Sequence, residues 1–129
     1  DPKIIAYNRI NVNASWSGSS SNIGGDYTFQ TFVHEIGHTI GLGHMGNYNG
    51  SAVFSTEALF ANDSWDTSIM SYFDQLENPN VNATKSYIPT LMTADVIALD
   101  NLYSVYGLRS LPHFHGHHCH YRFCNIYNH

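Results

Sequence analysis

Apolar residues recur at helical spacing in two parts of the chain. One such stripe runs from about 27 to 41 and follows Asp26, a residue type that caps helix N-termini. A second stripe runs from 93 to 106, with Thr93 as its expected N-cap and Gly107 as its expected stop. The stripe residues are Phe29, Phe32, Val33, Ile36 and Ile40 in the first segment and Met92, Val96, Leu99, Tyr103 and Tyr106 in the second. This pattern predicts two amphipathic helices.

The remaining segments lack helical periodicity. Residues 9–13 alternate polar and apolar side chains, which predicts a strand with one buried face. Residues 17–25 are rich in Ser and Gly and predict a loop. The long segments 44–67 and 74–90 are also expected to be loops, with a short helical turn near 57–61 in the first. A loop as long as 44–67 usually has a function, and we expect it to wall one side of a cleft.

Size and charge narrow the classes of function. The 129 residues suit one domain, and the formal net charge is −5 with only five Lys and Arg. No basic cluster occurs, so nucleic-acid and anionic-membrane partners are not expected. No apolar run reaches the length of a membrane span. We also expect the chain to be a monomer.

The segment from His34 to His44 carries the strongest chemical signal. It reads His34-Glu35-Ile36-Gly37-His38-Thr39-Ile40-Gly41-Leu42-Gly43-His44. His34 and His38 are four residues apart, so a helix places them on one face, where both can bind one metal ion. Gly41 can take a positive φ that ends the helix and turns the chain back, so that His44 supplies a third nitrogen. Three neutral histidines would leave a tetrahedral zinc ion one open position, which is typical of catalytic sites.

Three further residues have predicted roles near this site. Glu35 follows the first ligand and is offset around the helix, so it can reach a metal-bound water as a general base. Met70, in Ser68-Ile69-Met70-Ser71-Tyr72, has a flexible thioether that fills irregular space, and taken alone it would indicate a plain core residue. Tyr72 lies two residues after Met70, and its phenol could turn toward the metal or toward a developing oxyanion.

Taken together, these motifs resemble the catalytic domain of the serralysin-type metzincins, a family of secreted bacterial zinc endopeptidases. The resemblance extends over roughly residues 8–107. It rests on the His34–His44 segment with the preceding Phe32-Val33, on Gly46-Asn47-Tyr48-Asn49, on Ser68-Ile69-Met70-Ser71-Tyr72-Phe73 and on Leu102-Tyr103-Ser104-Val105-Tyr106-Gly107. It implies an α+β, zincin-like fold in which the active-site helix packs on a small mixed sheet, with a Met-turn and a closing helix.

The resemblance also implies roles for individual residues. Zinc would bind His34, His38 and His44, and Tyr72 would be a fourth ligand at rest that moves away when substrate binds. Glu35 would be the general base and Met70 the residue of the Met-turn. The substrate would be a protein or peptide, a proteinaceous inhibitor is left open as a partner, and the location would be extracellular. Two positions depart from the family pattern: Met45 stands where Pro is usual, and Asn47 where Asp is usual.

The two ends of the chain do not follow the family. We expect residues 1–107 to be a partial catalytic domain, because more sheet and a helix would precede the strand at 9–13. Residues 1–5 carry no signal-peptide pattern, so the extracellular location comes from the resemblance alone. The missing sheet motivates a second hypothesis, in which the chain is a weak or inactive zinc-binding remnant.

The tail, residues 108–129, holds six of the nine histidines and both cysteines, Cys119 and Cys124, where the family would continue into calcium-binding repeats. We interpret this tail as a disordered or foreign extension, with metal binding as the alternative.

Overall fold

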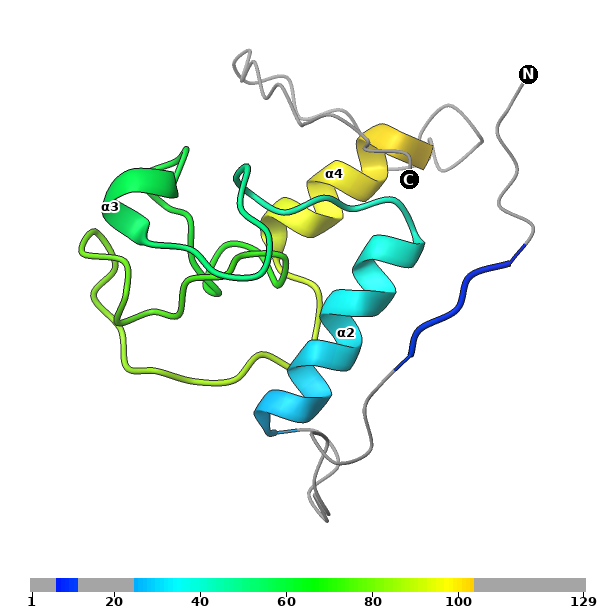
Figure 1. Ribbon diagram of the computed structural model, residues 1–129, viewed down its shortest axis with the longest axis horizontal. Coiled ribbons are helices and arrows are strands. Elements are labelled where there is room, and N and C mark those ends of the chain that lie inside the picture. Colours follow the sequence, from blue (N-terminus) through cyan, green and yellow to red (C-terminus); the bar gives the residue numbers. More distant parts are fainter. Residues whose placement is uncertain (1–6, 12–24, 104–129) are drawn as a thin grey trace, which may run out of the picture.

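The fold is built on two helices that lie side by side and on the long segment of the chain that connects them. The computed structural model describes residues 7–11 and 25–103. In it, α2 (Tyr27–Thr39) lies beside α4 (Thr93–Tyr103), while α3 (Phe54–Glu57) is a single turn in the long loop between them (Figure 1). The Tyr103 hydroxyl donates to the Ile40 carbonyl at 2.7 Å and joins the C-terminal ends of α2 and α4.

Both ends of α2 follow from its sequence. Asp26 is the N-cap as predicted, and its carboxylate accepts a hydrogen bond from the Phe29 amide at 2.8 Å. At the other end Gly41 has φ +101°, a value that side-chain-bearing residues rarely adopt. The Leu42 amide then donates to the Gly37 carbonyl at 3.0 Å and the Gly41 amide to the His38 carbonyl at 3.0 Å. This pair of bonds is the Schellman motif, and it turns the chain back toward the helix.

The core is divided into two apolar clusters. The first lies between α2 and α4 and centres on three buried residues, Leu42, Ile69 and Met70. Around it pack Val33, Leu91, Ala98 and Leu99. The second lies among the loops and centres on Met45, Tyr48 and Phe73. Because Leu42 belongs to the first cluster and Tyr48 to the second, the segment 42–48 passes from one cluster to the other.

The apolar stripes predicted for the two helices are only partly buried. Phe32 and Ile36 on α2 are 38% and 47% exposed, and Val96 on α4 is 55% exposed. The face of α2 that is buried instead carries Gln30 and Gly37. The packed face is set by the turn at Met70 and by α4, and close approach there favours a glycine over a large apolar side chain.

Three other predictions concern the short helical turn, the start of α4 and the segment 74–90. The short helical turn was expected near 57–61 but forms at Phe54–Glu57, because the Glu57 carboxylate reaches back to accept from the Val53 amide at 2.6 Å. Thr93 is the first residue of α4 and not its cap. The loop assignment of 74–90 is confirmed, since that segment forms turns and extended chain without helix or strand.

The predicted sheet is not seen in the described part of the chain. Residues 9–11 of the expected strand are described and are not in a strand, and 7–11 with 25–103 contain one isolated bridge, Asn49 to Ser51. The start of the loop at 17–25, the end of the closing helix at 104–107 and the His- and Cys-containing tail lie outside the described residues. Among those that are described, no helix is long and apolar enough to cross a membrane.

Candidate metal centre

Three backbone carbonyls fix the three predicted histidine ligands in the same way. The Nδ1 atom of His34 lies 2.8 Å from the carbonyl oxygen of Ile69, and that of His38 lies 2.9 Å from the carbonyl oxygen of Leu42. The Nδ1 atom of His44 lies 2.9 Å from the carbonyl oxygen of Tyr48. A carbonyl oxygen can only accept, so each Nδ1 must carry the proton. Each Nε2 is then left with a free lone pair, which is the tautomer that a metal ion requires.

The three Nε2 atoms converge on one point. Those of His38 and His44 are 3.1 Å apart, and those of His34 and His44 are 3.3 Å apart. The possible ligand atoms of all three residues lie within 4.8 Å of one another. Three lone pairs this close repel unless a cation lies between them. Zinc–nitrogen bonds of about 2.0–2.1 Å in a tetrahedron put neighbouring nitrogens about 3.3 Å apart, so these separations fit a zinc ion.

Burial favours the neutral form of the His34 and His44 rings. Burial lowers the pKa of His34, and the neighbouring His38 ring lowers it further. Burial, with repulsion from His38 and His34, lowers the pKa of His44 to about 4. A metal ion binds the neutral imidazole, so protons compete weakly for this site at neutral pH. The arrangement therefore suits a divalent cation better than a proton.

Met70 lies directly beneath α2. It is 1% exposed, and the Ser71 amide donates to the Ser68 carbonyl at 3.2 Å to close a tight turn around it. Its sulfur would be 2.5 Å from a β-carbon placed at Gly37, one residue before the second ligand. The same turn presents the Ile69 carbonyl to His34. Met70 is therefore buried against α2 beside the second predicted ligand, and its role as the Met-turn residue stays a prediction.

The two predicted catalytic side chains flank this cluster. The ring of Tyr72 lies 4.5 Å from that of His44, edge to face, and its hydroxyl accepts from the Gly50 amide at 3.4 Å. Glu35 follows His34 on α2 and is half-buried. No residue within 7–11 or 25–103 forms an ion pair with its carboxylate. The roles of Glu35 as a base and of Tyr72 as a ligand stay predictions.

Sequence reasoning missed two buried carboxylates behind the histidines. Asp95 is 2% exposed and accepts from the Ile69 amide at 2.9 Å, from the Ser68 hydroxyl at 2.5 Å and from the Met92 amide at 2.7 Å. Asp63 is fully buried and accepts from the Tyr48 hydroxyl. An acid in the first turn of a predicted helix is a signal that could have indicated Asp95. Nothing local distinguishes Asp63.

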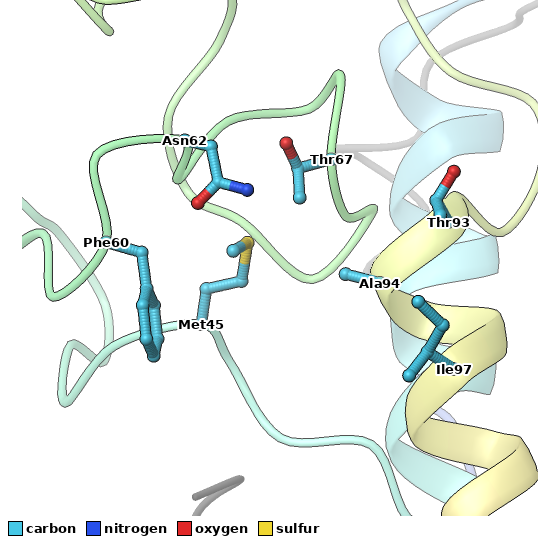
Figure 2. Close-up of a pocket in the computed structure, with 7 residues that line it drawn as sticks. All are labelled: Met45, Phe60, Asn62, Thr67, Thr93, Ala94 and Ile97. Carbon is cyan, nitrogen blue, oxygen red and sulfur yellow. The ribbon is translucent and has the colours of Figure 1, made fainter. Parts of the chain in front are cut away.

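A small cavity lies away from the histidine rings, on the side of Met45 that faces α4. Its volume is about 120 Å³. Figure 2 shows that the side chains of its lining come from the long loop and from the start of α4. The lining consists of Met45, Phe60, Asn62, Thr67, Thr93, Ala94 and Ile97. Because none of the three histidines lines it, this cavity is separate from the metal centre.

Comparison with known proteins agrees with this geometry, which is that of a metal-binding site. Residues 4–96 match the family described as metallo-peptidase family M12B, reprolysin-like. Serralysin C of Dickeya chrysanthemi is 38% identical over 98 residues, covering 66% of this chain and 20% of its own length. Metalloprotease AprA of Pseudomonas entomophila is 34% identical over 106 residues, covering 77% of this chain and 22% of its own. Serralysin of Proteus mirabilis is 30% identical over 110 residues, covering 79% of this chain and 22% of its own length.

The chain therefore belongs to the reprolysin-like metallopeptidases of family M12B, and it is a metzincin domain of the serralysin type. It spans about a fifth of the length of the curated relatives that it matches.

Proposed function

We propose that this chain is a zinc-dependent endopeptidase domain that hydrolyses peptide bonds. The observation that carries the proposal is the convergence of three bare Nε2 atoms, two pairs of them 3.1 and 3.3 Å apart. Bound there, zinc supplies a water of near-neutral pKa and polarises the scissile carbonyl. Family membership supports the same chemistry, and the serralysin resemblance supports an extracellular location with a protein or peptide as substrate.

Glu35 is the proposed general base. It directly follows a ligand on α2, and neither a Lys nor an Arg in the described part of the chain neutralises it by an ion pair. Its carboxylate takes a proton from the attacking water and returns it to the leaving amine. No step requires a covalent intermediate, because water is the nucleophile.

Tyr72 is the proposed partner of the developing oxyanion. Its ring lies against His44, and among the described residues only the Gly50 amide, at 3.4 Å, holds its hydroxyl. A hydroxyl held this weakly can change partners when substrate binds. It then donates to the oxygen that gains charge in the transition state.

Replacing Glu35 tests this proposal. Glu35→Gln keeps the size and polarity of the side chain but cannot accept a proton. The variant should bind zinc as the wild type does and should lose about 10²–10⁴-fold in kcat on a casein-type substrate, as expected for a lost general base. Unchanged cleavage would contradict the role of Glu35. Chelator-sensitive cleavage by the wild type supports the enzyme, whereas firm zinc binding without cleavage supports the remnant hypothesis.

A further inference from the structure

Asp63 is a fully buried carboxylate whose partners are hydroxyl groups. It accepts from the Ser71 hydroxyl at 2.6 Å and from the Tyr48 hydroxyl at 3.1 and 3.2 Å through its two oxygens. Within 7–11 and 25–103, no Lys or Arg forms an ion pair with it. A buried charge without a cation costs several kcal/mol unless hydrogen bonds compensate it. The hydroxyl groups of Ser71 and Tyr48 supply those hydrogen bonds, so the carboxylate holds both side chains in place.

Tyr48, one of the two partners of Asp63, contacts His44, the third histidine, in two ways. Its carbonyl oxygen accepts from His44 Nδ1 at 2.9 Å, and its ring stacks on the His44 ring at 5.6 Å with 26° between the planes. The ring also lies 4.7 Å from that of Tyr72. Tyr48 is 3% exposed and passes so close to Gly46 that a β-carbon there would be 2.6 Å from it. A shift of Tyr48 would therefore move both its contacts with His44.

Ser71, the second partner, belongs to the other half of the site. It ends the turn that holds Met70 and follows the Ile69 carbonyl, which accepts from His34. Through Tyr48 and Ser71, one carboxylate joins the segment that positions His44 to the turn that positions His34.

We propose that Asp63 is a positioning residue for the metal site, which holds the Tyr48 hydroxyl and thereby fixes the orientation of His44. This inference rests on the proposed zinc site but is independent of peptide cleavage. Groups that orient metal ligands in this way typically change metal affinity about 10–100-fold when they are replaced. The proposal differs from a purely structural role because it predicts a loss of affinity that depends on the Asp63–Tyr48 hydrogen bond.

The test measures zinc affinity in the full chain by competition with a chromophoric chelator. Zinc held by the tail is defined with a His34→Ala/His38→Ala chain and subtracted. Tyr48→Phe removes only the hydroxyl and should weaken zinc binding about 10–100-fold. Asp63→Ala removes the acceptor and should weaken it similarly, and the double variant should be no worse than either single one, because both remove the same link. Unfolding of the metal-free chains in urea measures stability in parallel.

Gln75→Ala is the control for stability, because it removes the hydrogen bonds of a buried side chain to the Ser86 backbone, which involve neither the histidines nor Asp63. It should lower stability while leaving zinc affinity near the wild-type value. Wild-type affinity in Tyr48→Phe would overturn the positioning role alone. So would a loss of affinity that parallels the loss of stability across all variants, Gln75→Ala included. A wild-type chain that binds no zinc at the three histidines would overturn the proposed function as well.

Discussion

The sulfur of Met70 occupies the space that a side chain at Gly37 would need. A β-carbon at Gly37 would lie 2.5 Å from that sulfur and 3.5 Å from a methyl group of Leu42. Met70 is 1% exposed and Leu42 6%, so neither side chain has room to withdraw. Gly37 is therefore a point of close approach between α2 and the turn at 68–71, one residue before His38.

Gly37→Ala should be destabilising, although Ala normally stabilises a helix by about 1 kcal/mol relative to Gly. Overpacking a filled core costs about 1–3 kcal/mol, and the contact with Met70 makes this the larger effect. Urea unfolding of the metal-free chain measures the change. Gly43→Ala is the control, since nothing lies within 4 Å of a β-carbon there. A stabilised Gly37→Ala chain would show that the turn does not press on α2 as described.

Asp95→Asn should lower the free energy of unfolding by about 1–3 kcal/mol, the range for leaving a buried hydrogen-bond donor without an acceptor. The carboxylate accepts from the Ile69 and Met92 amides through Oδ2 and from the Ser68 hydroxyl through Oδ1. An amide has one oxygen, so at least one of these donors would face an NH₂ group. Asp100→Asn, at an exposed position on α4, should be close to neutral in the same thermal and urea unfolding experiments.

The metal-free chain should lose stability as the pH falls from about 6.5 toward 4. The pKa of His44 is lowered from 6.5 to about 4 in the folded chain, chiefly by burial. Between these values the unfolded chain binds more protons at this position than the folded one, so acid favours unfolding. The loss is complete below the folded pKa. Thermal unfolding in the presence of chelator, at several pH values, measures this slope.

His44→Gln provides the comparison for that experiment, because it keeps a polar side chain without an ionisable ring. Its stability should depend less on pH between 6.5 and 4 than that of the wild type. Equal slopes in the two chains would place the proton uptake elsewhere.

The sequence predicted those parts of the site that depend on local spacing. Helix geometry predicts that His34 and His38 share a helix face and that Gly41 has a positive φ. Both histidines lie on α2, and φ at Gly41 is positive. Asp26 was recognisable because N-caps use a small set of side chains. These features need no information from distant parts of the chain.

What the sequence could not predict depends on contacts between distant segments. The carbonyl that accepts from His34 belongs to Ile69, 35 residues away, and the carboxylate that holds the Ile69 amide belongs to Asp95. Periodicity also failed to show which face of α2 is buried, since Phe32 is 38% exposed while Gly37 is buried. Tertiary packing decided these points, and hydropathy does not encode it.

The central claim is that His34, His38 and His44 hold one zinc ion through their Nε2 atoms. The most direct measurement is an anomalous difference map from crystals of the zinc-loaded chain, collected at the zinc absorption edge. We predict one peak bonded to all three Nε2 atoms at about 2.0–2.1 Å, with Nδ1 still donating to the three carbonyls. A chain whose zinc peaks all lie away from these nitrogens, or bond through Nδ1, would contradict the account.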